Sequence, residues 1–215
     1  MITEKDLEEV RSRDFLKIVD HYHELDDIET KLLLGKKPEK TVFLTIILPV
    51  YDHPQEFIRR AVQSVLQQTC SYDYQLLVID DYAKQTTSTE TEIYLRKLND
   101  PRVAYYKNEK NMGVFGNWNR AIVLSNSIWV SFLHSDDFLK DNYLENMKRI
   151  IDENSDIDQL ACNYKKLDFI RGNIDVNKEM IGGGYCTLRK VKYEEYLYNM
   201  VTSVKGSFYR REKLI

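Results

Sequence analysis

The feature that most restricts the fold is an alternation of strand patterns with amphipathic helix patterns, which begins at Thr41. The segment Val42–Val50 (VFLTIILPV) is almost wholly apolar and rich in β-branched residues, as a strand buried on both faces would be. Similar runs predict strands at 75–79, 103–106, 129–133 and 160–164, with helices after Pro54 and at 88–98, 117–124, 142–151 and 191–200. This alternation predicts an α/β fold with a mostly parallel sheet and helices on both faces.

The first 34 residues follow a different pattern. Apolar residues recur at intervals of three to five, at Leu7, Val10, Phe15, Ile18, Tyr22, Leu25, Ile28 and Leu32. This spacing predicts an amphipathic helix with one break, which packs on the main domain or on a second copy of the chain. Pro38 disfavours helix at the residue before it, so a linker follows. We therefore divide the chain into a helical extension with its linker, 1–40, and a main domain, 41–215.

The composition excludes several classes of protein. Of 215 residues, 43% are hydrophobic and 30% are charged, which is the balance of a globular chain. The 31 basic and 34 acidic residues leave a net charge of −3, so we expect no nucleic-acid partner. The sequence has no apolar run near the roughly 20 residues that span a bilayer, and its start does not read as a signal peptide. Three cysteines without CxxC spacing, Cys70, Cys162 and Cys186, favour a reducing compartment and a cytoplasmic location.

Polar residues cluster where three of the predicted strands end. They are Pro49, Tyr51 and Asp52 after the first strand, Asp80 and Asp81 after the second, and His134, Ser135, Asp136 and Asp137 after the fourth. Each group alone could be a helix cap or a turn. The ends of parallel strands meet at one edge of a sheet, however, and ligands bind there. Up to five carboxylates could therefore face one cleft.

Clustered carboxylates repel one another unless a cation or a ligand lies among them. Carboxylate oxygens without His and Cys at zinc spacing suit Mg²⁺ or Mn²⁺. Such a cation keeps open positions for phosphate oxygens, and a further carboxylate can accept hydrogen bonds from a base or a ribose. The strand ends therefore predict a site for a nucleoside diphosphate and a divalent metal.

Glycine-rich phosphate loops are absent from the sequence, which contains neither GxGxxG nor GxxxxGK[ST]. A dinucleotide-dependent dehydrogenase and a P-loop enzyme are therefore disfavoured. The segment NMGVFGNWNRA, 111–121, offers two glycines that permit close backbone approach, with Asn117, Asn119 and Arg120 as polar groups. Its alternative interpretation is a polar loop with Trp118 as a core anchor.

Four segments of the sequence together resemble the family-2 glycosyltransferases of the GT-A fold. The segments that carry the resemblance are TIILPVYDHPQEFIRRAVQSVLQQT, LLVIDDY, DPRVAYYKNEKNMGVFGNWNRAI and WVSFLHSDD. They lie in the family's order between about 41 and 148, and GSFYRREKLI near the end resembles the strand before the family's acceptor region. The resemblance implies a GT-A, Rossmann-like fold.

The resemblance also implies roles for individual residues. Pro49 and Tyr51 would line the nucleotide base, and Asp81 would accept its N–H. Asp136 would hold the ribose and support the metal, and Asp137 would ligate Mg²⁺ or Mn²⁺. Asn117 and Arg120 would be donors toward the ribose or the diphosphate. The implied reaction is displacement with inversion, in which a carboxylate base takes the proton of the acceptor hydroxyl.

The sequence departs from the family pattern at four places. Asp52 replaces a usual Asn, Tyr82-Ala83 replaces Gly-Ser or Asp-Pro, and His134 stands where an acid is common. The fourth departure is that no residue matches the family's catalytic base by position, so we assign none. The pair Glu194–Glu195 precedes the last strand, and solvation of a helix explains it better.

We therefore expect a glycosyltransferase domain that uses a UDP-sugar donor and a glycan or lipid-linked acceptor in cell-surface polysaccharide synthesis. The resemblance allows peripheral association at the inner face of the membrane and a homo-oligomer through the N-terminal helices. The first alternative is a truncated or non-catalytic nucleotide-sugar-binding module. A sugar-phosphate nucleotidyltransferase would need a glycine-rich loop after the first strand, and a phospho-acceptor domain would carry its acidic pair there.

Overall fold

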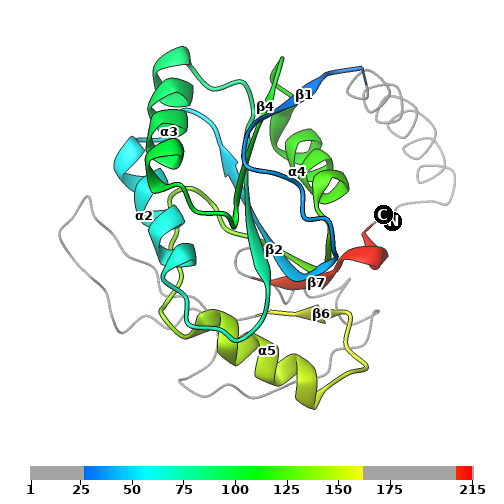
Figure 1. Cartoon of the computed structure of the whole chain (residues 1–215). Coiled ribbons are helices and arrows are strands. Elements are labelled where there is room, and N and C mark those ends of the chain that lie inside the picture. Colours follow the sequence, from blue (N-terminus) through cyan, green and yellow to red (C-terminus); the bar gives the residue numbers. More distant parts are fainter. Residues whose placement is uncertain (1–26, 162–206, 215) are drawn as a thin grey trace, which may run out of the picture.

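The computed structural model describes residues 27–161 and 207–214, which form one sheet with helices packed on it (Figure 1). The strands are β1 (Thr30–Leu34), β2 (Val42–Val50), β3 (Tyr74–Asp80), β4 (Val103–Asn108), β5 (Ser127–Phe132), β6 (Gln159–Leu160) and β7 (Phe208–Arg210). The helices are α2 (Gln55–Leu66), α3 (Gln85–Leu98), α4 (Gly113–Leu124), α5 (Tyr143–Glu153) and the short 3₁₀ helix η1 (Arg211–Lys213).

The sheet has a parallel centre and antiparallel edges. Its strand order is β1-β4-β3-β2-β5-β7-β6. Strands β4, β3, β2 and β5 run parallel, whereas β1 pairs antiparallel with β4, and β7 pairs antiparallel with both β5 and β6. The prediction of a mostly parallel sheet is confirmed, as is the strand expected in GSFYRREKLI.

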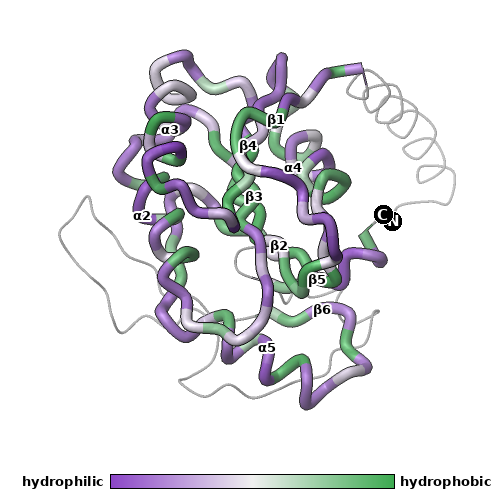
Figure 2. Tube along the Cα trace, viewed as in Figure 1, coloured by the Kyte–Doolittle hydropathy of each residue, from purple (hydrophilic) through white to green (hydrophobic). Residues whose placement is uncertain are grey.

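Helices cover both faces, and β2 shows how the sequence produces this (Figure 1). Ile46 and Leu48 belong to one core cluster with residues of α2, α3 and α5, whereas Ile47 belongs to a second cluster with residues of α4. Because successive strand residues point to opposite faces, an apolar strand needs a cover on each side. The hydropathy trace in Figure 2 alternates between green and purple along α5, as expected of a helix with one buried face.

The predicted N-terminal helix is wrong at Thr30–Leu34, where the chain forms β1. The backbone N–H of Glu109 bonds the carbonyl of Glu29 at 3.0 Å, which continues the antiparallel pairing with β4. The apolar spacing is ambiguous here because three consecutive leucines fit a half-exposed edge strand as well as a helix. Residues 1–26 lie outside the described residues, so the rest of the helical extension stays a prediction.

Gly35 ends β1 at a place that has no room for a side chain. Its φ is +79°, and a Cβ atom built there would lie 2.1 Å from the carbonyl oxygen of Val103. A glycine is therefore required where the chain leaves β1 across β4.

Other boundaries differ in detail. Helix α4 begins four residues before the predicted 117, and β6 covers only the first residue of the predicted strand 160–164. Residues 162–164 and the helix expected at 191–200 lie outside the described residues. None of the helices in the described ranges combines the length and apolar character that a membrane span requires.

Candidate functional site

The loops after β2, β3 and β5 begin side by side at one edge of the sheet. Val50 is in register with Asp80, and the N–H of Asp81 donates to the Val50 carbonyl at 2.9 Å. The N–H of Leu133, just beyond β5, donates to the Ile47 carbonyl at 2.9 Å. The prediction that the three strand ends converge is confirmed.

Asp81 is a buried carboxylate that the start of α4 and the end of β4 hold in place. Its side chain is 5% exposed, and Oδ1 accepts the backbone N–H of Met112 at 2.7 Å and Nδ2 of Asn108 at 3.0 Å. Burial raises the pKa of Asp81 above its ordinary value, and these hydrogen bonds offset part of the shift. The carboxylate is thus fixed in position at the edge where β2 and β3 end.

Asn108 is a residue that the sequence analysis missed. It is fully buried, and Nδ2 donates to Asp81 and also to Oδ1 of Asn117 at 2.9 Å. Its Oδ1 accepts the hydroxyl of Thr30 at 2.7 Å. One amide therefore connects β1, β3, β4 and α4. The only sequence signal was a polar residue at the end of an otherwise apolar strand.

Two predicted donor-side residues belong to this network. Asn117 is 2% exposed, and its oxygen accepts from Asn108. Arg120 donates from Nη1 to the Ile28 carbonyl at 2.9 Å and to the Thr30 hydroxyl at 3.2 Å, so that atom is committed to the β1 region. Their predicted contacts with a ribose or a diphosphate stay predictions.

Two of the five strand-end carboxylates, Asp80 and Asp52, have protein partners on both oxygens. Asp80 is fully buried and accepts from Ala83 N at 2.7 Å, from the Ser88 hydroxyl at 2.5 Å and from the Tyr105 hydroxyl at 2.8 Å. The expectation that it shares the cleft is therefore wrong. Asp80 is the last residue of β3 and directly precedes Asp81, and adjacent residues of an extended chain point to opposite faces.

Asp52 connects the loop after β2 to the loop after β3. Its Oδ1 accepts the backbone N–H of Lys84 at 2.8 Å, and its Oδ2 lies 3.3 Å from the Lys84 ammonium. The backbone hydrogen bond from Lys84 holds the pKa of Asp52 below its ordinary range. This carboxylate fixes the relative position of two loops.

Residues 134–137, which we call the acidic loop, contain a group that could hold a cation. One ligand atom from each of His134, Asp136 and Asp137 lies within 4.8 Å of the others. Two ligands about 2.2 Å from one ion are separated by up to about 4.4 Å, so a small movement would place all three on the same ion. The nitrogen and oxygen donors fit Mn²⁺ well and Mg²⁺ through the carboxylates.

Neighbouring side chains fix the acidic loop from both sides. The His134 ring lies 5.5 Å from that of Trp118, which lies 4.9 Å from Phe132 in β5. On the other side, the Ser135 hydroxyl is hydrogen-bonded to Nδ1 of His53, a residue of the loop after β2. The sequence did not predict His134 as a candidate ligand or His53 as a support of this loop.

Tyr51 and Pro49 lie on the β2 side of this edge. Tyr51 is 49% exposed and Pro49 is half-buried. An exposed aromatic ring at a strand end offers a surface on which a planar ligand can stack.

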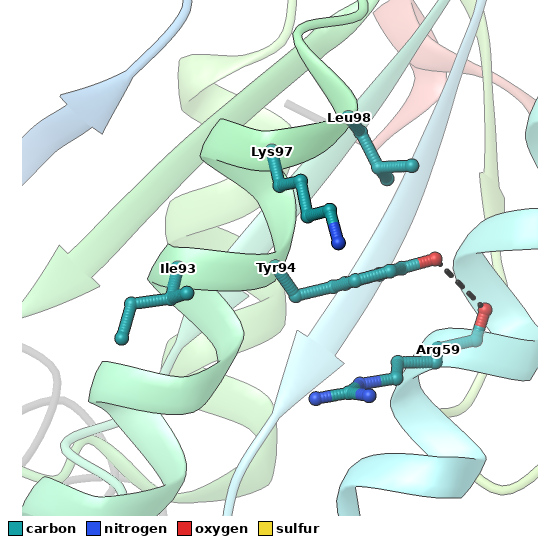
Figure 3. Close-up of a pocket in the computed structure, with 5 residues that line it drawn as sticks. All are labelled: Arg59, Ile93, Tyr94, Lys97 and Leu98. Atoms are coloured by element: carbon teal, nitrogen blue, oxygen red, sulfur yellow. Dashed lines mark hydrogen bonds between the residues drawn. The ribbon is translucent and has the colours of Figure 1, made fainter.

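A pocket between α2 and α3 is separate from this edge. It is lined by Arg59, Ile93, Tyr94, Lys97 and Leu98, and by none of the predicted site residues (Figure 3). The Tyr94 ring extends toward α2, where its hydroxyl donates to the Arg59 carbonyl at 3.5 Å and the guanidinium lies 5.2 Å from the ring centroid. These contacts join the two helices, and we assign the pocket no part in the site.

Known proteins share parts of the sequence and the fold of this chain. The chain is 28% identical over 157 residues to the UDP-Glc:alpha-D-GlcNAc-diphosphoundecaprenol beta-1,3-glucosyltransferase WfgD of Escherichia coli, which covers 73% of this chain and 55% of WfgD. The fold is shared with S. aureus TarS 1-349 in complex with UDP, with a TM-score of 0.59 and 20% identity over 80% of this chain and 48% of TarS 1-349. It is also shared with the Pyrobaculum calidifontis mannosyltransferase PcManGT in complex with GDP-Man and Mn²⁺, with a TM-score of 0.51 and 13% identity over 73% and 45% of the two chains.

The chain therefore spans about half the length of the proteins it resembles. The family description that matches the sequence is Glycosyl transferase family 2, and the match covers residues 45–214, from the middle of β2 to the end of η1. The chain belongs to the family 2 glycosyltransferases.

Proposed function

We propose that this chain binds a UDP-type sugar nucleotide across the end of β2, as the donor half of an inverting glycosyltransferase. The observation that carries the proposal is that Asp81 directly follows β3 and the acidic loop follows β5, on either side of β2. Two strand spacings separate β3 from β5, about 10 Å. That distance leaves room for a ribose between a base at Asp81 and a diphosphate at the acidic loop.

On the β3 side, Asp81 accepts an N–H of the base while Tyr51 stacks on the base plane and Pro49 lines it. The fixed position of the Asp81 carboxylate supports this role, because a buried acceptor that is already oriented loses little entropy on binding. The UDP complex of TarS, which shares the fold, supports a uridine nucleotide.

On the β5 side, Asp137 and Asp136 hold Mg²⁺ or Mn²⁺, with His134 as a further ligand. Asp136 also contacts the ribose, and Asn117 and Arg120, which bond Asn108 and the β1 region, are further donors toward the ribose or the diphosphate. The Mn²⁺ complex of PcManGT supports the choice of cation. When bound, such a cation supplies positive charge that stabilises a departing nucleoside diphosphate.

Transfer of the sugar needs a general base near the acceptor hydroxyl. We assign no such residue in the described part of the chain, and Glu194 and Glu195 lie outside it. We propose a glycan or lipid-linked acceptor at the cytoplasmic face of the membrane, in keeping with the lipid-linked acceptor in the name of WfgD. The alternative is a nucleotide-sugar-binding module without transfer activity.

Calorimetric titration of the 215-residue chain with UDP, GDP and CDP, with and without Mn²⁺, tests the proposal. We expect UDP to bind only with the metal, and Asp137→Ala to abolish that binding with little change in Tm. Asp152→Ala is a matched control, since this exposed carboxylate pairs with Lys148 on α5. A UDP affinity that is the same without Mn²⁺ and in Asp137→Ala would contradict the proposed site. A product assay with UDP-sugars then separates a transferase from a binding module.

A further inference from the structure

Tyr82 follows Asp81 directly and has an unusual backbone conformation. Its φ is 61°, in the left-handed region where a side chain with a Cβ atom is strained. Among the described residues, the other non-glycine residue with positive φ is Asn99, which ends α3 and donates its N–H to the Leu95 carbonyl at 3.3 Å. Asparagine tolerates this conformation and helix ends often use it. Neither reason applies to Tyr82.

Two carboxylates bind the peptide N–H groups that follow Tyr82 and so hold its backbone in this conformation. The N–H of Ala83 is bound by Asp80 Oδ1 at 2.7 Å, and that of Lys84 by Asp52 Oδ1 at 2.8 Å. The Tyr82 side chain itself is 56% exposed. The ring therefore contributes little packing in return for the strain, and strain of this kind concentrates at functional sites.

A second exposed tyrosine lies on the adjacent loop. The bond from Asp81 N to the Val50 carbonyl, 2.9 Å, joins the two loops just before the tyrosines, and the Asp52–Lys84 bond joins them just after. The same two hydrogen bonds therefore lie before and after Tyr51 as before and after Tyr82 along the two loops, and each residue is about half exposed. Two aromatic side chains therefore flank the backbone of the proposed base acceptor.

We propose that Tyr82 is a second aromatic contact for the nucleotide base, beside Tyr51, and that it increases the affinity for the base portion of the donor. The inference rests on the proposed donor site and adds a residue to it. Aromatic rings give affinity through stacking on the face of a base, without need of a hydroxyl. Tyr82 should therefore act through its ring and not through its oxygen.

The test compares Tyr82→Phe, Tyr82→Asn and Tyr82→Gly in the full chain, with Asn99→Gly as the control at the other left-handed position. UDP with Mn²⁺ is the probe that has the base, and inorganic pyrophosphate with Mn²⁺ is the probe that lacks it. We expect Tyr82→Phe to bind UDP like the parent chain, and the Asn and Gly variants to bind it about tenfold or more weakly. Pyrophosphate affinity should stay unchanged in every variant.

Thermal unfolding supplies a readout that separates binding from folding. Asparagine and glycine relieve the strain, so Tyr82→Asn should have a Tm no lower than the parent while its UDP affinity falls. A Tyr82→Asn chain that binds UDP as tightly as the parent would show that Tyr82 does not contact the base. It would not contradict the proposed donor site. A parent chain that binds neither UDP nor GDP with Mn²⁺ would overturn both.

Discussion

Nδ2 of Asn108, at the end of β4, donates to Oδ1 of Asp81, at the end of β3, over 3.0 Å. The carboxylate that we propose as the base acceptor is thus oriented by a buried amide from the neighbouring strand. Loss of this amide also leaves Oδ1 of Asn117 without the donor that it has in the structure.

We therefore predict that Asn108→Ala lowers the free energy of unfolding by about 1–3 kcal/mol, the usual cost of an unsatisfied buried polar group. UDP affinity should fall as well, because Asp81 loses a support. Urea denaturation and calorimetry measure the two effects. Asn126→Ala is the control, since Asn126 bonds the Pro38 carbonyl at 2.8 Å, in a different network. Equal UDP affinity in parent and Asn108→Ala would show that the amide has no part in the site.

The ionised Asp81 carboxylate should lower the free energy of unfolding at neutral pH. Burial raises its pKa in the folded chain, so the folded state favours the protonated form. A raised folded-state pKa gives a stabilisation that is present below the unfolded-state pKa and is lost as the pH rises through the folded-state value. Asp81→Asn should therefore be as stable as the parent at pH 7 or more so, and its advantage should shrink as the pH falls toward the ordinary value of 3.8.

The measurement is the difference in unfolding free energy between Asp81→Asn and the parent over that pH range, since other titrating groups largely cancel in the difference. UDP binding at pH 7 should weaken in the same variant, because an amide replaces an anionic acceptor. An advantage that grows on acidification would contradict the assigned direction of the shift.

His134 should influence the choice of cation. An imidazole nitrogen favours Mn²⁺ over Mg²⁺, and His134→Asp would give an all-oxygen set that narrows this preference. The Mn²⁺-to-Mg²⁺ affinity ratio, measured by competition, should therefore fall in the variant. Pulsed electron paramagnetic resonance of bound Mn²⁺ should show a nitrogen coupling that His134→Asp lacks. Strong Mn²⁺ binding with no nitrogen coupling in the parent would remove His134 from the ligands.

Gly35→Ala should destabilise the fold by more than Gly113→Ala. Both positions have positive φ, +79° and +70°, so both variants carry conformational strain of about 1–2 kcal/mol. Only at Gly35 would the added Cβ also meet backbone, 2.1 Å from the Val103 oxygen, whereas nothing lies within 4 Å at Gly113. Urea denaturation gives the comparison, and equal losses in the two variants would mean that β1 can shift away from β4 at little cost.

The strands were predictable where burial on both faces leaves a strong sequence pattern, as in β2 and β3. Strand β1 was not, because it is short and half-exposed. Its conformation depends on pairing with β4, in which Asn108, the partner of Thr30, lies 78 residues further along the chain. The same separation hid Asn108, since no local pattern reports a contact between Thr30 and Asn108. The rule that parallel strands end at one edge of a sheet was enough to predict that Asp81 and the acidic loop lie at the same edge.

The role of Asp80 could have been predicted and was not. Adjacent residues of an extended chain point to opposite faces, so Asp80, the last residue of β3, and Asp81, which follows it, were poor candidates to share one cleft. The partners that satisfy Asp80, Ser88 and Tyr105, were not predictable, because they come from α3 and β4. The sequence therefore predicted the sheet edge at which the site lies. Which carboxylates can bind a ligand there depends on hydrogen-bond partners that only the structure shows.

In the proposed complex, one nucleotide spans the end of β2 from Asp81 to the acidic loop. A crystal structure of the chain with UDP and Mn²⁺, with anomalous scattering to locate the metal, tests it most directly. We predict the base against Tyr51 with an N–H on Asp81, and the manganese peak within ligand distance of Asp137. A base or a metal bound elsewhere, such as the pocket between α2 and α3, would contradict the account.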